Sequence, residues 1–516
     1  MTDHAAPSKD RPDTAALSTA LAEGNPDEVR RLLSRGADLR YRLEHGYDAL
    51  ITAVHGRNVF GDERLLELLQ VLIEHGAELS NVTSYGESGL RVLSRLGRFD
   101  AVRLLLDAGA DKSHLEWTPL IKAVALGTLT DVQSLLAAGA LLEDRDWWSR
   151  SAWHVALQVG DLSKAALLRD HGADVNAVGR CGQPPLFYAI QSHRTAVLRW
   201  LLELGFDVER TDDFGCTALI EAVEVGHEEG VEFLLQAGAE IDREHNGGTA
   251  LSDARSAHMV TRLLDAGANP RYLSNGGRRV LLGLPPDEDE SLLDDVLPDD
   301  FVRARTRRFG VSNPERMVEP FWVGMIRSGL TGYQANQRFG GPSSLDAQPV
   351  WCACRFGQSI TRLPDGRIVQ IAGEHEDSYD PDFCIYNDVF VHDADGTIHI
   401  YGYPQDVFPP TDFHTATLVD DFIYIIGSLG YSAQRAYGTT PVYRLDIRDW
   451  SIQPVPTTGK APGWLRDHRA MRVSGHEIRG VGGQVLTLVE DEVQQSENVG
   501  AFVLDIQRGV WQEARE

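Results

Sequence analysis

The chain has 516 residues, of which 42% are hydrophobic and 24% charged, and its net charge of −27 gives a pI near 5.0. This length is enough for two or three domains that each bury a core. The acidic balance argues against a nucleic-acid binder and against a protein held on an anionic membrane, because both need clustered positive charge. The sequence has no apolar run of the length that a membrane-spanning helix needs.

Cysteine usage and the N-terminus indicate where the protein works. Five cysteines are too few for a disulfide framework, and their odd number fits a reducing compartment. The N-terminal stretch MTDHAAPSKDRPDTAALSTA lacks the apolar core of a signal peptide. We therefore expect a cytoplasmic protein with a flexible N-terminus over residues 1–13. The excess of arginine over lysine is typical of a GC-rich, bacterial genome.

A glycine-containing tag recurs through the first half of the chain. It reads Gly-Ala-acidic or a close variant, recurs at intervals of 40, 33, 30, 33, 33, 33 and 29 residues, and follows a leucine pair, as in VRRLLSRGAD. The glycine falls where a helix end needs a left-handed residue. Between tags lies a second helical start, such as WTPLIKAV, with a capping threonine and a proline in the first turn. The tags occupy residues 36–38, 76–78, 109–111, 139–141, 172–174, 205–207, 238–240 and 267–269.

This helix–helix–hairpin unit of about 33 residues resembles the ankyrin repeat, whose T-P-L-H-x-A pattern keeps its histidine in SAWHVAL at 151–157. The resemblance covers about residues 14–270. It implies a domain of residues 14–275 in which about eight units stack into an α-helical solenoid, because no unit can bury its apolar face alone. In the family, the role of His154 is a hydrogen bond within the hairpin and the helix start.

Some units depart from the family pattern. ESGLRVLS replaces the T-P-L segment in the unit after Gly76, and the unit after Gly109 has a shortened hairpin. The interval of 40 residues predicts an insertion near 55–66. Within the stack, we expect Leu141–Leu142 and Trp153 to be buried.

The resemblance also implies a binding surface, because the hairpin tips and inner helices of the family form a concave face that binds other proteins. Counting from each tag to the next glycine places Tyr85, Trp147, Trp148 and Phe214 at tips, and Arg180 joins them as a candidate contact. Tryptophan is the residue most often found at binding hot spots. The alternative is that at least one tryptophan of the adjacent pair packs on the neighbouring hairpin.

The repeat pattern fails after Pro270. Acidic and proline residues fill LPPDEDESLLDDVLPDD at 284–300, and four arginines follow within 303–308. Such a segment either folds back as an ion-paired hinge or stays solvated, and we favour a solvated linker over residues 276–316. The more apolar stretch 317–349 is expected to be an ordered connector that contains a helix.

A second repeat begins near residue 350. Three copies alternate apolar and polar residues around turns such as PDG and DADG, which predicts four short strands per copy. A period near 50 residues resembles the kelch repeat, which implies a partial β-propeller of about three blades over residues 350–516. The stretch 349–359 looks like the outer strand of a preceding blade. The aligned positions are Ser359, His414 and His468, Gly373, Gly427 and Gly482, and Val389, Val442 and Phe502.

Three blades do not close a ring, since propellers usually have four to eight. Three alternatives remain: residues 301–349 fill the gap, the solenoid covers an open fan, or two chains combine as a homodimer. Each would explain the join, because an incomplete propeller leaves apolar sheet faces that need a partner.

The best candidate for a catalytic or metal-binding site is the segment GEHEDSYDPDFCIYND at 373–388. Its weak candidate metal ligands are Glu374, His375, Glu376 and Asp380, which could also act as general acid and base. Cys352 and Cys354 lie two apart on an expected strand and Cys384 could join them, but this spacing is a poor zinc signal. No cofactor is predicted, and no nucleophile elbow or dinucleotide fingerprint is present in the sequence.

The sequence therefore predicts a multidomain α plus all-β protein that works as a protein-binding adaptor or scaffold. The ankyrin-like face would capture a protein partner, and the kelch-like module would give a second surface. A narrower version is an immunity protein that masks a toxin, for which the acidity would suit a basic partner. The alternative class is a metal-dependent enzyme or a sugar-binding propeller that uses the loop 373–388.

Overall fold

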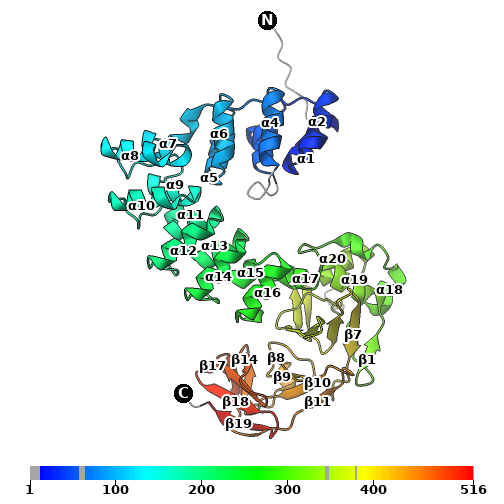
Figure 1. Cartoon of the computed structure of the whole chain (residues 1–516). Coiled ribbons are helices and arrows are strands. Elements are labelled where there is room, and N and C mark those ends of the chain that lie inside the picture. The colour runs from blue at the N-terminus through cyan, green and yellow to red at the C-terminus, as the bar shows by residue number, and fades with distance from the viewer. Residues whose placement is uncertain (1–11, 57–63, 343–347, 378–379, 515–516) are drawn as a thin grey trace. The chain divides into compact units, whose positions relative to one another are not determined.

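The structure is a computed structural model that describes residues 12–56, 64–342, 348–377 and 380–514 (Figure 1). The side chains of residues 12–13 and 377–382 lie outside this description. The chain divides into two compact units, Met1–Ala250 and Leu251–Glu516, and each is described by itself. Most of the expected N-terminal segment 1–13 and the centre of the expected insertion at 55–66 lie outside the described residues.

The first unit is built from successive helix pairs, as the tag period predicts. A short turn or hairpin separates one pair from the next, and three of these turns are 3-10 helices in the described residues: η1 (Glu44–Gly46), η2 (Lys112–Leu115) and η3 (Arg180–Gly182). The helices are α1 (Pro12–Ala22), α2 (Pro26–Ser34), α3 (Ala49–Val54), α4 (Leu65–Glu74), α5 (Gly89–Arg95), α6 (Phe99–Asp107), α7 (Pro119–Leu126), α8 (Leu129–Ala137), α9 (Ala152–Val159), α10 (Leu162–Asp170), α11 (Pro185–Gln191), α12 (Thr195–Glu203), α13 (Ala218–Glu224) and α14 (Glu228–Gln236).

Local chemistry starts and stops these helices where the tags predict. The Thr118 side chain accepts a hydrogen bond from the backbone N–H of Ile121 at 3.2 Å, and Pro119 fills the first turn of α7. At the other end of each pair, the tag glycine has positive φ, for example +97° at Gly109 and +91° at Gly172. A residue with a side chain is strained in that conformation, so glycine ends the helix there.

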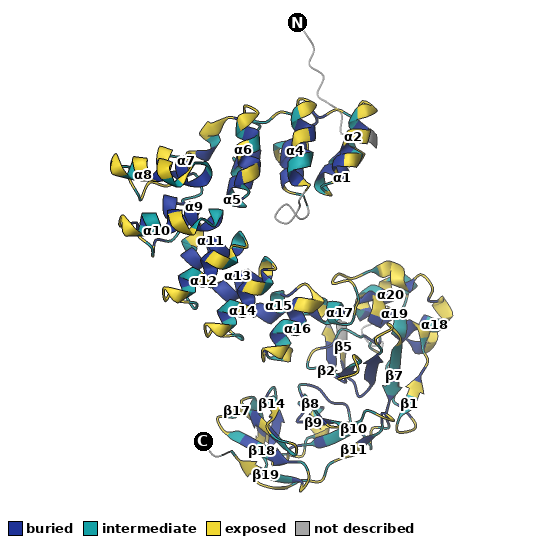
Figure 2. Ribbon diagram, viewed as in Figure 1, coloured by how far each residue is buried: buried dark blue, intermediate teal, exposed yellow. Residues whose placement is uncertain are grey.

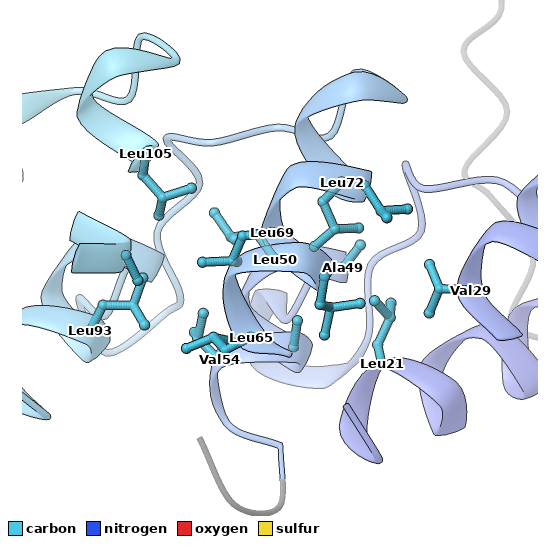
Figure 3. Close-up of a cluster of buried hydrophobic side chains, with 14 of the residues drawn as sticks. Leu21, Val29, Ala49, Leu50, Val54, Leu65, Leu69, Leu72, Leu93 and Leu105 are labelled. Atoms are coloured by element: carbon cyan, nitrogen blue, oxygen red, sulfur yellow. The ribbon is translucent and has the colours of Figure 1, made fainter. Parts of the chain in front are cut away.

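The core of the first unit runs from one helix pair to the next rather than forming a closed centre. Leucines and small apolar residues of α1 to α6 interdigitate, and Figure 3 shows Leu21, Leu50 and Leu93 from three successive pairs in one cluster. Each pair therefore depends on its neighbours for burial, as in a stacked repeat. Burial colouring shows the same alternation of buried and exposed helix faces along the unit (Figure 2).

Two burial predictions have different outcomes. Trp153 is buried, with 1% of its surface exposed, as expected. The prediction for Leu141 is wrong: the residue is 68% exposed, and Leu142 is only partly buried. The reason is its position in the tag, since the equivalent third residues Asp111 and Asp174 are also exposed.

The second unit opens with the end of the helical repeats. It contains α15 (Ala250–Asp253), α16 (Ala257–Asp265), the turn η4 (Pro270–Tyr272) and α17 (Asn275–Leu281). The eighth tag glycine, Gly267, again has positive φ of +98°.

The segment expected to be a solvated linker is instead folded. It forms η5 (Glu290–Leu293) and α18 (Pro298–Ala304), and both Leu293 and Phe301 are buried. In the described part of the connector 317–349, the chain forms α19 (Pro320–Ser328) and α20 (Gly332–Phe339); residues 343–347 lie outside the description. We call residues 290–339 the helical cap. The segment is highly charged, but its few apolar side chains are buried because they pack on Phe390 and Ile400 of the first sheet. This burial explains why the segment folds.

Three antiparallel four-stranded meanders follow the helical cap. Short edge strands join two of them, β1 (Glu315–Met317) on the first and β12 (Thr458–Gly459) on the third. Their strands are β2 (Ser359–Arg362), β3 (Ile368–Ile371), β6 (Val389–His392) and β7 (Ile398–Gly402); β8 (Thr415–Val419), β9 (Phe422–Ile426), β10 (Val442–Asp446) and β11 (Ile452–Pro454); and β14 (Arg469–Arg472), β15 (Glu477–Val481), β18 (Ala501–Asp505) and β19 (Val510–Glu513).

Longer excursions leave the sheets between their second and third strands. The first is the hairpin β4 (Glu374–Asp377) and β5 (Asp380–Ile385). The third contains β16 (Gln484–Val489) and β17 (Glu492–Glu497), which pair with β13 (Trp464–Arg466). The second is a loop with the turn η6 (Ser432–Gln434). In all three meanders the excursion thus interrupts the chain at the same place in the strand order.

Contacts between a hydroxyl group and a histidine link adjacent sheets, and the two histidines are at aligned positions of the repeat. The Ser359 hydroxyl lies 2.8 Å from Nε2 of His414, and the Thr415 hydroxyl lies 2.9 Å from Nε2 of His468. Apolar side chains fill the space between the first and second sheets and between the second and third. The described strands of the three meanders do not close into a ring.

The stretch 349–359 differs from its prediction. Only Ser359 belongs to a strand; Val350 and Phe356 make isolated bridges to Thr306 and Glu374. The chain bends at Ala353, so Cys352 and Cys354 do not lie on a strand as expected.

Candidate functional site

The hairpin that carries the two tryptophans is held by a buried ion pair. The Asp146 carboxylate accepts hydrogen bonds from the backbone N–H groups of Trp148 at 3.0 Å and Arg150 at 2.9 Å. It also pairs with the Arg150 guanidinium at 2.6 Å, and both side chains are fully buried. A buried pair of this kind fixes one geometry strongly, because neither charge has water as an alternative partner.

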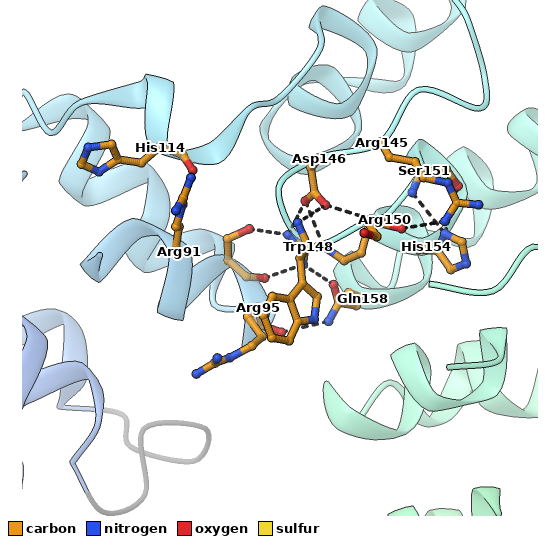
Figure 4. A network of polar contacts seen from close by, with 12 residues as sticks. Arg91, Arg95, His114, Arg145, Asp146, Trp148, Arg150, Ser151, His154 and Gln158 are labelled. Atoms are coloured by element: carbon orange, nitrogen blue, oxygen red, sulfur yellow. Dashed lines mark hydrogen bonds and ion pairs between the residues drawn. The ribbon is translucent and has the colours of Figure 1, made fainter. Parts of the chain in front are cut away.

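Arg150 connects the hairpin by hydrogen bonds to helix α5, which lies two repeat units earlier in the chain. Its Nη1 donates to the Ser94 carbonyl at 2.7 Å and to Oε1 of Gln158 at 2.6 Å, and Gln158 donates to the Arg95 carbonyl at 3.1 Å (Figure 4). The intervening unit has the short turn η2 in place of a projecting hairpin. Because η2 does not project, the hairpin forms hydrogen bonds directly with α5, across the intervening unit.

This arrangement brings both tryptophans against arginines of the inner helix α5. The rings of Trp147 and Trp148 are 4.8 Å apart, with Arg91 over the first at 5.0 Å and Arg95 over the second at 5.0 Å. Arg180 of the next hairpin lies 4.2 Å from the Trp148 ring centre. Guanidinium groups bind aromatic faces through the ring quadrupole. We call these five residues the tryptophan–arginine cluster.

The two alternatives for the tryptophan pair were exposure at the hairpin tip and packing on the neighbouring hairpin, and the structure shows part of each. Both rings are half-buried, and Trp148 contacts Arg180 on the neighbouring hairpin, yet each keeps some exposed surface. The buried Nε1 of Trp147 has no hydrogen-bond partner among the described residues. Arg91 and Arg95 form ion pairs with Glu116 and Glu87, respectively. Exposed Arg180 makes no ion pair with any residue in the described ranges.

The other predicted tip residues are exposed on separate hairpins. Tyr85 is 54% exposed, and its hydroxyl lies 2.5 Å from that of Tyr47. Phe214 is 63% exposed, and its backbone N–H donates to Asp212 at 2.9 Å. Neither residue is among those that contact the tryptophan rings in the described structure.

His154 has the structural role expected of its motif. The backbone N–H of Ser151 donates to its Nδ1 at 3.1 Å, so the proton is on Nε2, which donates to the Ala177 carbonyl at 3.0 Å. Burial lowers the pKa of His154 to about 4. The neutral ring joins one hairpin to the start of α9.

The acidic loop 373–388 does not bring its first candidates together. Glu374 and His375 are neighbours on β4 and point to opposite faces. His375 lies with Nδ1 3.1 Å from the Cys354 carbonyl, Glu376 is exposed, and the Asp380 side chain falls outside the described residues.

Glu374 instead faces an acidic residue that the sequence analysis missed. Its carboxyl group lies near that of Asp412, whose Oδ1 accepts a hydrogen bond from the Gly430 N–H at 2.6 Å. Burial and the adjacent Asp412 raise the pKa of Glu374 to about 8, and burial also raises the pKa of Asp412. The two carboxyl groups therefore share a proton near neutral pH.

Among the described residues, one group places three ligand atoms close enough for a metal ion: Cys216, Glu221 and Glu224. Burial raises the pKa of Glu221 to about 7, and its carboxylate accepts a hydrogen bond from Gln191 at 2.8 Å. The sequence has no ligand spacing that would have indicated this group.

Comparison with known proteins identifies the helical repeats. A family model described as ankyrin repeats (3 copies) matches residues 120–212, 153–245 and 205–273. The chain therefore contains ankyrin repeats. The matches end at residue 273 and leave the three meanders of the second unit unassigned.

Several curated proteins are similar over part of their length. An L-asparaginase of Dirofilaria immitis is 30% identical over 161 residues, 30% of this chain and 27% of that protein. The ankyrin repeat protein nuc-2 of Neurospora crassa is 26% identical over 235 residues, 44% of this chain and 21% of that protein. The B-cell lymphoma 3 protein homolog of Mus musculus is 30% identical over 227 residues, 42% and 50% of the two chains. The chain thus spans half or less of the length of these relatives.

The described helices include none that is long and apolar enough to cross a membrane.

Proposed function

We propose that this protein is a protein-binding adaptor or scaffold whose ankyrin repeats capture a partner through the tryptophan–arginine cluster. The observation that carries the proposal is the half-buried tryptophan pair held rigidly between α5 and the next hairpin. Rigid aromatic groups bring large contact area at little entropic cost, and tryptophan and arginine dominate binding hot spots.

The cluster also favours a particular kind of contact. Arg180 is exposed and stacks on Trp148 without a carboxylate partner in the described residues. It would pair with a carboxylate of the partner while the indole rings take an adjacent apolar side chain. The net charge of −27 would attract a basic partner from a distance, so the two preferences act at different ranges.

We further propose that the three meanders are blades of an incomplete kelch-like propeller that gives a second binding surface. Supporting this are the up-and-down strand order and the matched Ser–His and Thr–His contacts between neighbouring sheets. Masking of a toxin by the chain would be a narrower form of the same binding function.

The enzyme or sugar-binding alternative has less support. Glu374 and His375 face opposite sides of β4, so they cannot act on one substrate atom or ligate one ion without rearrangement. The adaptor function is therefore the stronger proposal.

The test compares capture by four versions of the full chain in native cell extract, the wild type and three variants, with quantification by mass spectrometry. Replacing Trp147 and Trp148 with alanine should weaken partner binding by roughly 2–4 kcal/mol. Arg180→Ala should weaken binding without removing buried surface. The matched control is Phe356→Ala, which removes an aromatic ring that is 62% exposed in the second unit.

Three results bear on the proposal. Partners that bind the wild type and the Phe356 variant but are depleted from the tryptophan and Arg180 variants support it. Equal recovery on all four proteins contradicts it. If the double tryptophan variant loses cooperative melting, the pair is part of the core and the Arg180 variant decides.

A further inference from the structure

Two thiols lie in contact beside the chain that leads into the first sheet. The Cys354 thiol lies 3.2 Å from the carbonyl oxygen of Gly329, at the end of α19. The Cys352 thiol lies 3.5 Å from the Cys354 carbonyl oxygen, and the two thiols lie close enough for each to shift the pKa of the other. The bend at Ala353 makes this contact feasible. Cys352 is buried, whereas Cys354 keeps partial access to solvent.

Two arginines of α17 face the same place, and the described residues provide neither with an ion pair. Arg279 is 6% exposed; its Nε donates to the Pro285 carbonyl at 2.7 Å and its Nη2 to the Asp287 carbonyl at 3.0 Å. Its buried Nη1 has no hydrogen-bond partner in the described structure. Arg278 donates to the Gln358 carbonyl at 3.1 Å, and burial lowers its pKa to about 10.

The Arg279 guanidinium packs directly on the residue that the thiol contacts. A Cβ added to Gly329 would lie 2.3 Å from Nη1 of Arg279, so the absence of a side chain there is what admits the arginine. Carbonyl oxygens satisfy donors but do not neutralise a buried positive charge. A thiolate at Cys354 would add a negative charge beside Arg279, on which the carboxylates of Asp287, Glu288 and Asp289 also act.

The environments of the thiols differ accordingly. The neighbouring Cys352 thiol lowers the pKa of Cys354, and Arg279 and Arg278 lower it further, while burial and the carboxylate of Glu288 act in the opposite direction. At Cys384 the balance is reversed: burial raises the pKa of this thiol although Arg307 and Arg355 act to lower it. A thiolate beside cations is the usual setting of a reactive cysteine.

We propose that Cys354 is a nucleophilic cysteine and Cys352 its resolving partner, so that the pair forms a reversible disulfide in exchange with a low-molecular-weight disulfide such as oxidised glutathione. This goes beyond the adaptor function, because it makes the contact between α17 and the first sheet respond to the thiol state of the surroundings.

The exchange balances in two steps. The Cys354 thiolate attacks one sulfur of oxidised glutathione, the glutathione disulfide bond breaks, and one glutathione thiolate leaves. The Cys352 thiol then loses its proton to water and attacks the Cys354 sulfur of the mixed disulfide, which releases the second glutathione. The protein dithiol is oxidised to a disulfide and one oxidised glutathione is reduced to two thiols.

The first experiment uses the intact native chain. After incubation with oxidised glutathione, the protein is alkylated, digested with trypsin without reduction and analysed by mass spectrometry. The peptide Phe339–Arg355 contains both cysteines; after oxidation it should carry no alkyl group and be lighter by two hydrogen atoms than the unalkylated dithiol peptide. In the reduced protein, iodoacetamide should modify Cys354 at least about tenfold faster than buried Cys384.

Variants separate the roles of the groups. Cys352→Ser should leave glutathione attached to Cys354, because no resolving thiol remains. Arg279→Gln should slow alkylation of Cys354 several-fold, whereas Arg472→Gln, at an arginine distant in sequence, should leave the rate unchanged. The proposal is overturned if native Cys354 reacts no faster than Cys384, or if oxidised glutathione yields no linkage within the 339–355 peptide. Both readings come from the wild type, so they stand even where a variant is unstable.

Discussion

Each unit has one place where its repeat pattern is incomplete, and the two places are stabilised by opposite means. In the first unit, one ankyrin repeat has only the short turn η2. Across it, the buried Arg150 donates a hydrogen bond to the Ser94 carbonyl of the preceding repeat, and the Asp146 carboxylate neutralises its charge. In the second, the outer face of the first sheet is covered by the apolar helical cap, whose Trp322 stacks on Trp351 with ring centres 4.8 Å apart. A charged bridge gives a single geometry but adds little net stability, whereas an apolar cover contributes most of its stability through area.

The largest effect should come from removing the helical cap. A fragment of residues 350–516 exposes the face that Phe390 and Ile400 present to it, and several hundred Å² of lost apolar burial costs on the order of 10 kcal/mol. That is comparable to the whole stability of a domain. We expect this fragment to aggregate, while residues 285–516 stay monomeric by light scattering and residues 14–275 fold as a solenoid. A soluble, cooperatively melting monomer of 350–516 would show that the cap is dispensable.

The next effect concerns the charged bridge. Arg150→Met leaves Asp146 buried without its partner and should cost about 3–5 kcal/mol. Adding Asp146→Asn, which keeps the hairpin hydrogen bonds but removes the charge, should restore part of that loss. The control is Arg448→Met, whose exposed pair with Asp446 should matter by less than about 1 kcal/mol.

Calorimetry of the full chain measures this, because only the transition of the first unit should move. If the single and double variants melt alike, the charge of Asp146 does not matter and the hydrogen bonds alone hold the hairpin.

A smaller effect is expected at the carboxyl pair of the second unit. Since the pKa of Glu374 is raised from 4.5 to about 8, the folded chain keeps a proton that the unfolded chain releases above pH 4.5. The contribution of this group to stability therefore falls as pH rises from about 4.5 to 8. Glu374→Gln should remove that slope and stabilise the chain at pH 8 by on the order of 2 kcal/mol, with little effect near pH 4.5.

Urea unfolding at pH 5 and pH 8 checks the expectation. Glu376→Gln changes the exposed neighbour on the same strand and should behave like the wild type at both values. Parallel pH profiles for wild type and Glu374→Gln would mean that the proton is not held at this pair.

How much the sequence predicted depended on the range of the contacts. The tag period predicted the ankyrin repeats, since each glycine and cap acts within one unit. The contact of Arg150 with Ser94 joins residues 56 apart, and only the 30-residue interval hinted at it. The charged run 284–308 was interpreted as solvated although Leu293 and Phe301 within it are core residues. The many charged residues made the few apolar ones easy to overlook. Those apolar residues are buried because they pack against the first sheet, which a local sequence pattern does not show.

The same lesson applies to Leu141, where the smallest effect is expected. Its place in the tag is taken by an exposed acidic residue in other units, as at Asp111 and Glu240, so the tag itself indicates that this position faces water. With 68% of its surface exposed, the leucine loses little on substitution. Leu141→Asp should change the free energy of unfolding by less than about 0.5 kcal/mol. Leu168→Ala, at a fully buried position of the same repeat, should cost about 2–5 kcal/mol in the same melt. A loss above about 1 kcal/mol for Leu141→Asp would mean that this leucine packs in solution and that the alternation of buried and exposed positions does not extend through the tag.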